Sequence, residues 1–217
     1  REENERKKLA LAIYDGLGHQ LLLLRSLIGQ CVTAPEIGER LKVQMEQMSL
    51  MALECLESAR GIAYRLRPFE LDQLGLGEAI ERMTDHLCCG SDLRVFKDLK
   101  ALPEEWFNEP QKLHLFRIAE EGVKNAIHHS HASNLMIEIK RKERMLELLI
   151  TDDGRGFESS SERGQSTPGL GLSLLREHAR AVQGRLDVDS SPGRGTMIRC
   201  LIPRPPLAKA SSVLRHQ

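Results

Sequence analysis

The sequence lacks an excess of either charge, because its 217 residues carry 31 Lys and Arg against 31 Asp and Glu. Without a general positive field the chain has no ready means of holding a polyanion by counterion release, so we expect no direct binding of nucleic acid. Aromatic residues are also scarce, at 4%, while hydrophobic residues make up 41%. This balance favours helices that pack through Leu, Ile, Met and Ala over an aromatic-rich β-sandwich.

Long apolar runs and signal peptides are absent as well. No stretch approaches the roughly 18 apolar residues that a transmembrane helix needs, so we expect this segment to be cytoplasmic. The sequence begins with Arg1 rather than Met. We therefore expect it to belong to a longer protein, and an inner-membrane anchor in the upstream part stays open. The five cysteines show no CxxC or Cys/His ligand spacing, which fits reduced thiols.

The first part of the chain shows the spacing of two long helices. From Glu2 to about Gln30 there is no proline, and apolar residues recur every three or four positions, at Leu9, Ile13, Leu17, Leu21, Leu24 and Ile28. After a break near Pro35, a heptad pattern runs through Leu41, Met45, Met48, Ala52, Cys55, Ala59, Ile62 and Leu66. A helix of about 30 residues is about 45 Å long and needs a partner along its length. We therefore predict a helical hairpin over residues 1–67 and a homodimer that forms a four-helix bundle, with an intramolecular coiled hairpin as the alternative.

Pro68 ends the second helix and marks an expected domain boundary. After a tight connector between Leu66 and Leu76, the apolar periodicity predicts an α/β sandwich over residues 68–203, so the fold class is α+β. Its expected helices and strands are Gly77–Cys89, Leu93–Leu99, Pro110–His131, Asn134–Arg141, Met145–Thr151, Gly171–Gln183, Arg185–Asp189 and Thr196–Ile202. Residues 204–217, with two adjacent prolines, predict a disordered tail.

The helix after Pro110 carries a cluster of polar residues that includes Glu121, Lys124, Asn125 and His128. Glu121 and Asn125 are four residues apart, so a carboxylate and an amide share one helical face. An amide oxygen is a hard ligand that suits Mg²⁺, and a carboxylate one turn away can orient or deprotonate an attacking group. Lys124 or His128 can face phosphate. Alone, the cluster fits an ordinary polar helix face better.

Glycine-rich turns follow at three places. In Asp152-Asp153-Gly154-Arg155-Gly156, directly after a strand, a carboxylate can accept a hydrogen bond from an exocyclic amine such as that of adenine. Gly169-Leu170-Gly171-Leu172 opens a helix whose free N–H groups can hold phosphate, after a stretch from Glu158 to Pro168 that can close as a lid. Gly193-Arg194-Gly195-Thr196 lies between the last two strands, where a plain hairpin turn is the alternative.

The order of these motifs resembles the ATP-binding domain shared by histidine kinases, gyrase-type ATPases and Hsp90-type chaperones, the GHKL type. Glu5–Leu21, Leu66–Leu76 and Leu115–Ser133 resemble sensor histidine kinases of the nitrate-sensor and DesK type in particular. The resemblance covers about residues 5–203. It implies the cytoplasmic core of a two-component kinase that binds Mg-ATP, autophosphorylates on histidine and transfers the phosphoryl group to an Asp of a response regulator receiver domain.

The resemblance also implies roles for individual residues. Asn125 would coordinate Mg²⁺, Glu121 would assist phosphoryl transfer, and Asp152 would bind adenine with support from Thr196. The remaining candidates for the nucleotide pocket and its lid are Lys124, His128, His129, Gly154, Gly156, Gly169, Leu170, Gly171 and Leu172. Either of the two histidines can instead cap or pack.

One departure from the family concerns its central chemistry. The family's phosphoacceptor is a histidine immediately before Asp-Gly-Leu-Gly-His, and here that position is Tyr14. A phenol with a pKa of about 10 is mostly protonated, so we expect no ordinary autophosphorylation at residue 14. His19 lies five positions on, about 140° around an α-helix, so it cannot simply substitute. Asp15 and His19, however, lie one turn apart and match the family's phosphatase pair, which orients water against a phospho-aspartate.

Three interpretations of Tyr14 stay open. The acceptor was replaced to trap one state, or the chain is a natural homologue biased towards phosphatase or pure signalling activity, or it phosphorylates tyrosine. The competing class is a non-enzymatic dimerisation module whose α/β domain is an ATP-dependent clamp. An anti-sigma-factor type of serine kinase shares the ATP domain but lacks a long bundle, so residues 1–67 argue against it.

Overall fold

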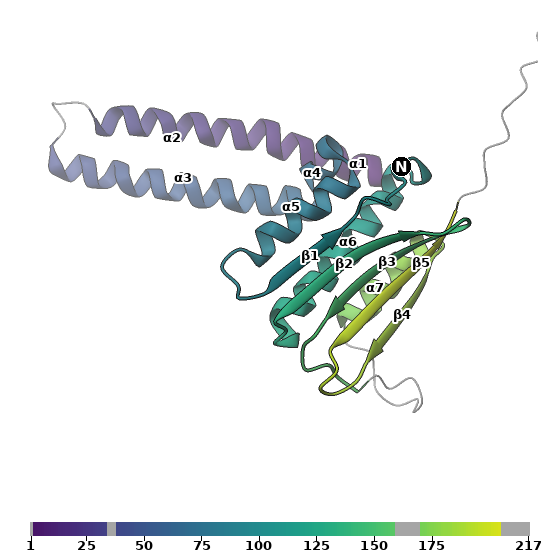
Figure 1. Ribbon diagram of the computed structural model, residues 1–217. Coiled ribbons are helices and arrows are strands. Elements are labelled where there is room, and N and C mark those ends of the chain that lie inside the picture. The colour runs from purple at the N-terminus through teal and green to yellow at the C-terminus, as the bar shows by residue number, and fades with distance from the viewer. Residues whose placement is uncertain (1, 34–37, 159–169, 205–217) are drawn as a thin grey trace, which may run out of the picture. The chain divides into compact units, whose positions relative to one another are not determined.

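The structure, a computed structural model, describes residues 2–33, 38–158 and 170–204. The chain divides into two compact units, Arg1–Gln73 and Leu74–Gln217. The first unit is helical and the second contains the sheet (Figure 1). None of the helices in the described ranges combines the length and the apolar character needed to cross a membrane. Gly169, most of the predicted lid and the tail from residue 205 onward lie outside the described residues.

The first unit is a helical hairpin followed by a short helix (Figure 1). Its first arm consists of α1 (Glu2–Leu11), η1 (Ala12–Leu17) and α2 (Gly18–Val32), and its second arm is α3 (Glu39–Leu66). The residues of α3 that pack into the hairpin are small or apolar and at most 5% exposed, namely Ala52, Leu56, Ala59 and Ala63. The buried face therefore takes only part of the heptad pattern. Of its other members, Leu41, Met48, Cys55 and Ile62 are exposed, and Met45 and Leu66 are half-buried.

The first arm departs from the single α-helix that its sequence predicts. Residues Ala12–Leu17 form a π-helical turn, and the N–H of Gly18 donates to the carbonyl of Ile13, five residues earlier. Such a turn places residues five apart near one another and changes the direction of the side chains in it. Tyr14 lies within this turn.

The connector predicted between Leu66 and Leu76 contains a short helix, α4 (Phe69–Leu74). The buried guanidinium of Arg67 pairs with Asp72 at 2.8 Å, and Nζ of Lys7, on α1, lies 2.9 Å from the same carboxylate oxygen. These contacts tie α4 to the hairpin. The first unit extends to Gln73 and includes most of this short helix.

The second unit is a five-stranded sheet with helices on one face (Figure 1). The strand order is β1-β2-β3-β5-β4, with β1 and β2 parallel and the other pairs antiparallel. The strands are β1 (Arg94–Asp98), β2 (Asn134–Arg141), β3 (Met145–Asp152), β4 (Arg185–Ser190) and β5 (Thr196–Pro203). The helices are α5 (Leu76–Cys88), η2 (Glu104–Trp106), α6 (Glu109–Asn125), η3 (Ala126–Ser130) and α7 (Leu170–Ala181). A helical region followed by a mixed α/β unit confirms the predicted fold class.

Close packing between α6 and β3 positions the functional end of the second unit. Phe116 and Ile118 of α6 are fully buried, as are Leu135 and Ile137 on the inner face of β2. A Cβ atom at Gly122 would lie 2.6 Å from Cδ1 of Ile150, so only glycine lets the helix approach the strand this closely. The turn of α6 that follows therefore lies over the sheet near the end of β3.

Candidate functional site

The start of α6 is fixed by a capping box. Oδ1 of Asn108 accepts from the N–H of Gln111 at 3.0 Å, and Oε1 of Gln111 accepts from the N–H of Asn108 at 3.1 Å. Each side chain thereby satisfies a backbone donor that the helix leaves free. At the other end of α6, Glu121 and Asn125 lie one turn apart, with Nδ2 of Asn125 3.5 Å from Oε1 of Glu121. The expected carboxylate and amide thus do share one face.

Directly after Asn125 the helix changes to the π-helical turn η3, which ends it against the loop that follows β3. The hydroxyl of Ser130 donates to the carbonyl of Ala126 at 2.6 Å, and the N–H of Arg155 donates to the carbonyl of Ser130 at 2.7 Å. A Cβ atom at Gly154 would collide with this same carbonyl of Ser130. Gly154 is therefore needed for the close approach of the loop to the end of the helix.

The two adjacent carboxylates at the end of β3 have different surroundings. Oδ1 of Asp152 accepts from the N–H of Gly154 at 2.9 Å. Burial raises the pKa of Asp152, and backbone hydrogen bonds from Gly154 and Thr196 only partly offset this. Asp153 is exposed, and its carboxylate accepts three hydrogen bonds from Ser133 and Asn134 that lower its pKa. Asp153 therefore fixes the start of β2, whereas Asp152 is the half-buried acceptor.

Ser190, the last residue of β4, joins three parts of this region. Its buried hydroxyl lies 3.0 Å from Oγ1 of Thr196, 3.0 Å from the carbonyl of Gly195, and 3.0 Å from the N–H of Phe157, which donates to it. Gly195 has a φ of +74°, and a Cβ atom there would collide with the carbonyl of Asp152. The Gly-x-Gly-Thr turn is thus packed against the carboxylate strand, which a plain hairpin turn does not require.

These elements enclose a cavity of about 490 Å³ in the second unit. It is lined by eight of the predicted site residues, namely Glu121, Asn125, His129, Asp152, Gly156, Gly171, Leu172 and Thr196. Gly122, Ser130, Ile150, Phe157 and Ile198 complete the lining. A Cβ atom at Gly171 would collide with the carboxylate of Glu121. The start of α7 therefore lies directly against the acidic face of α6.

Three predicted residues are not among those that line the cavity. Nζ of Lys124 pairs with Oε1 of Glu120 at 2.6 Å. Burial by itself raises the pKa of Glu120, but hydrogen bonds and charges from Lys124 and Arg117 lower it overall. The ring of His128 contacts that of His129 edge to face, with centroids 6.3 Å apart. Gly154, the third, supports the loop beneath Asp152. Nothing is described for Gly169 or for the side chain of Leu170.

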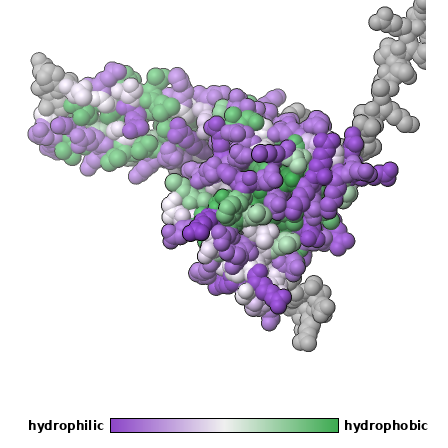
Figure 2. Space-filling model, viewed as in Figure 1, coloured by the Kyte–Doolittle hydropathy of each residue, from purple (hydrophilic) through white to green (hydrophobic). Residues whose placement is uncertain are grey.

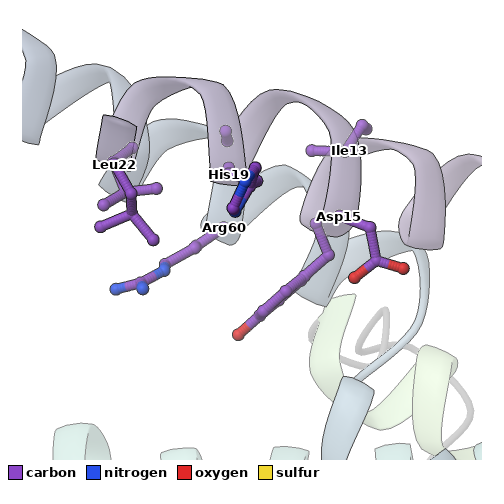
Figure 3. A pocket seen from close by; sticks show the side chains of 9 residues that line it. Ile13, Asp15, His19, Leu22 and Arg60 are labelled. Carbon is purple, nitrogen blue, oxygen red and sulfur yellow. The ribbon is translucent and has the colours of Figure 1, made fainter. Parts of the chain in front are cut away.

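A second cavity, of about 360 Å³, lies in the first unit beside the π-helical turn. It is lined by Ile13, Tyr14, Asp15, Gly18, His19, Leu22, Leu56, Ala59 and Arg60. His19 and Arg60 come from different arms of the hairpin, and Figure 3 shows the carboxylate of Asp15 pointing away from the side chain of Arg60. Tyr14 is half-buried, and its ring stacks on that of Phe69 with centroids 5.1 Å and planes 14° apart.

The position of His19 relative to Tyr14 differs from expectation. An α-helical spacing places them about 140° apart, yet both side chains line the same cavity. The reason is the π-helical turn between them, in which residues five apart come near one another. His19 is therefore closer to Tyr14 than the sequence indicates.

Sequence reasoning missed several residues of both cavities. Ile150 and Ile198 occupy buried strand positions that look like ordinary core. Ser190, which supports the first cavity through its contact with Thr196, ends a strand with no motif around it. Arg60 lies in the polar part of a heptad pattern, where a charged residue is usual. Gly122, inside the Glu121 to Asn125 motif, did give a signal, because glycine within a helix marks a close approach.

The comparisons with known proteins agree with this geometry. Residues 111–206 match the family described as histidine kinase-, DNA gyrase B- and HSP90-like ATPase, and residues 5–71 match the family described as histidine kinase. The histidine kinase domain of a blue-light activated histidine kinase from Erythrobacter litoralis has the same fold, with a TM-score of 0.55 and 14% identity over 86% of this chain and 94% of that one. The fold and the site thus define a GHKL-type ATPase domain that follows a histidine kinase hairpin.

Sequence relatives define the family more closely. Sensor protein VraS of Staphylococcus saprophyticus is 30% identical over 203 residues, which cover 93% of this chain and 56% of that protein. Signal transduction histidine-protein kinase/phosphatase DegS of Brevibacillus brevis is 30% identical over 206 residues, which cover 93% of this chain and 52% of that protein. The chain thus contains the histidine kinase hairpin domain and the GHKL-type ATPase domain, and it is similar to sensor histidine kinases over 93% of its length. It spans about half the length of the curated relatives it matches.

Proposed function

We propose that this chain is the cytoplasmic core of a two-component sensor kinase and that its second unit binds Mg-ATP. The observation that carries the proposal is the convergence of Glu121, Asn125, Asp152 and Thr196, from three separate motifs, on one cavity of about 490 Å³. That volume lies in the range of small-molecule sites.

The lining of the cavity suits an adenine ring at one end. Ile150 and Ile198 offer apolar walls, and Asp152 offers a carboxylate that can accept from an exocyclic amine. Because Oδ1 of Asp152 is already held by Gly154, the carboxylate is oriented before a ligand arrives. Thr196, held through Ser190, supports the same end.

The other end of the cavity suits phosphates and a magnesium ion. Glu121 and Asn125 provide a carboxylate and an amide oxygen, the hard ligands that Mg²⁺ accepts. Bound there, Mg²⁺ would neutralise phosphate charge. The start of α7 lies against Glu121 at Gly171, where free helical N–H groups are available to phosphate oxygens. In this arrangement the carboxylate of Glu121 can act as a proton acceptor next to the phosphates.

The surface of the helical hairpin supports a homodimer through residues 1–67. Figure 2 shows hydrophobic residues gathered on the surface of α2 and α3. Those at least 45% exposed include Leu23, Leu24, Leu27, Leu41, Val43, Met48, Leu50, Met51 and Ile62. Such an area of exposed apolar surface favours association. The same hairpin would dock the receiver domain of a response regulator, because it carries Asp15 and His19.

Tyr14 favours a second candidate function for this chain, in which phosphatase activity dominates. Tyr14 replaces the acceptor, its ring is held by Phe69, and Asp15 and His19 line the adjacent cavity. The name of the relative DegS includes both kinase and phosphatase. We infer that this chain does not autophosphorylate at residue 14 and acts on a phosphorylated receiver domain instead.

Calorimetric titration with Mg-ATP tests nucleotide binding. Asp152→Asn and Asn125→Ala should each weaken affinity about tenfold or more, since each removes a polar contact worth about 1.5 kcal/mol or more. Asp187→Asn, which changes a carboxylate on β4 that pairs with Arg185, is the matched control and should leave affinity unchanged. Equal affinity in all four proteins would contradict the proposal.

Loss of phosphate from a phosphorylated receiver domain tests the second candidate. The unsubstituted chain should accelerate the loss, and Asp15→Ala should abolish the acceleration. No acceleration by either protein would favour the non-enzymatic clamp.

A further inference from the structure

The cavity beside the π-helical turn contains a residue that none of the motifs includes. Arg60 projects from α3, whereas Tyr14, Asp15 and His19 come from the first arm of the hairpin. Figure 3 shows the side chain of Arg60 extending into the open side of the cavity that His19 also lines. A group bound there would contact both arms of the hairpin.

We propose that Arg60 binds a phosphoryl group in this cavity, next to Asp15 and His19. The inference rests on the proposed function, because it names how the first unit holds the phosphoryl group on which the Asp15 and His19 pair acts. The chemistry is that of a phosphoryl dianion, supplied either as an acyl phosphate of a partner or as free phosphate.

Charge in the cavity points to Arg60. Asp15 is an acid and would repel a phosphoryl dianion, and Tyr14 contributes a neutral hydroxyl. Among the described residues that line the cavity, Arg60 is the one with a permanent positive charge. A guanidinium also offers several N–H donors in a plane, which matches two phosphoryl oxygens at once. Arg60 therefore supplies what the phosphatase pair lacks.

The present partner of Arg60 is easily displaced. Nη1 of Arg60 lies 3.3 Å from Oε1 of Glu57, three residues earlier on α3, and the two side chains are 43% and 63% exposed. A solvent-exposed pair of this kind contributes little to stability. An incoming dianion can therefore compete with Glu57 for the guanidinium.

The size of the cavity is consistent with a phosphoryl group. Small residues, Gly18 and Ala59, form part of its wall, and its volume of about 360 Å³ exceeds what one phosphate needs. A Cβ atom at Gly18 would lie 3.6 Å from the carbonyl oxygen of Ile13 and 3.8 Å from Cδ1 of Leu56, which are ordinary van der Waals distances. Room remains for the peptide segment that carries an acyl phosphate.

The test is a titration of the full chain with inorganic phosphate. NMR monitors the side-chain signals of His19 and Arg60 during the titration and gives the affinity for phosphate. Arg60→Gln should weaken the phosphate affinity reported by His19 about tenfold or more, since it removes charge-assisted hydrogen bonds. The affinity of Arg60→Lys should lie between those of Arg60→Gln and the unsubstituted chain, because lysine keeps the charge and lacks the planar donors. Arg40→Gln, an exposed arginine in the first turn of α3, is the matched control and should bind like the unsubstituted chain.

Glu57→Gln gives the opposite prediction and leaves Arg60 in place. Removing the competing carboxylate should tighten phosphate binding at His19. Acetyl phosphate, a small acyl phosphate, separates the two sources: a stronger response than to inorganic phosphate indicates a partner's acyl phosphate, and an equal response indicates phosphate in general. In both cases Arg60 must be required.

Unchanged binding in Arg60→Gln, or no response of His19 to either probe, would overturn the inference. Methyl signals of Ile198, followed during an ATP titration of the same samples, report the proposed nucleotide site separately. If Ile198 does not respond to ATP while phosphate binding still depends on Arg60, the proposed nucleotide binding is contradicted. If Ile198 responds to ATP but phosphate binding does not depend on Arg60, this inference is contradicted.

Discussion

The ring of Tyr14 stacks on the ring of Phe69, with centroids 5.1 Å apart and an angle of 14° between their planes. The contact joins the π-helical turn of the first arm to α4, the short helix that ends the first unit. Tyr14, which we propose stands at the phosphoacceptor position, therefore also holds part of the structure. The two roles make separate predictions.

The stacked pair should contribute to stability beyond the area that it buries. Offset aromatic pairs are worth about 0.5–1.5 kcal/mol of coupling. A double-mutant cycle of Tyr14→Ala and Phe69→Ala, followed by urea unfolding of helical structure, should show a coupling energy of about that size. Additive single effects would show that the two rings pack independently.

Restoring a histidine at residue 14 should restore autophosphorylation. In Tyr14→His an imidazole replaces the phenol, and the product with labelled ATP should be an acid-labile phosphoramidate. Tyr14→Phe and the unsubstituted chain should take up no label at this position, and Tyr14→His combined with Asn125→Ala should also take up none. Stable label that maps to Tyr14 would instead support tyrosine phosphorylation.

Asp72 should be more important to stability than any surface carboxylate. Its partner Arg67 is only 1% exposed at its side chain, so Asp72→Ala breaks a buried ion pair and should cost about 3–5 kcal/mol. Glu78→Ala, which breaks an exposed pair with Arg82, should cost about 0.5 kcal/mol or less. Denaturant unfolding of both variants measures the difference.

Acid should weaken the same contact. Burial by itself raises the pKa of Asp72, but hydrogen bonds and charges from Arg67 and Lys7 lower it overall from 3.8. A carboxyl whose pKa is lowered by folding stabilises the folded state when the pH is above the pKa of the unfolded state. This contribution is lost as the pH falls below the unfolded pKa and through the lower folded pKa. The stability difference between the unsubstituted chain and Asp72→Asn should therefore shrink as the pH is lowered through this range.

A histidine pair between α6 and α7 should make the second unit acid-sensitive at milder pH. Nδ1 of His114 lies 3.0 Å from Nδ1 of His178, so one nitrogen must donate and the other accept. Burial, followed by His114, lowers the pKa of His178 from 6.5. Because the unfolded state takes up a proton more readily, the free energy of unfolding should fall as the pH drops below about 6.5.

Thermal or denaturant unfolding of the unsubstituted chain and of His178→Gln at about pH 7.5 and about pH 5.5 checks this. The loss of stability on acidification should be smaller in His178→Gln. His86→Gln, at an exposed position of α5, is the control and should behave like the unsubstituted chain. An equal loss in all three would mean that the pair does not titrate on unfolding.

The sequence alone determined most of the long helices and strands and the nucleotide motifs, because these depend on local spacing. β2 has the predicted bounds Asn134–Arg141, since strict alternation of apolar residues marks its core face. The four-residue step from Glu121 to Asn125 placed both on one helical face, and the glycines after Asp152 marked a turn. These signals lie within one or two turns of chain.

Only the tertiary structure decided which distant groups meet. A π-helical turn gives no sequence signal, and it brings His19 to the cavity of Tyr14. The pairing of β4 with β5 sets Ser190 opposite Thr196, and the packing of the two arms sets Arg60 of α3 beside His19. Such neighbours follow from register and packing across the fold, whereas a sequence pattern reports only the face on which a residue lies.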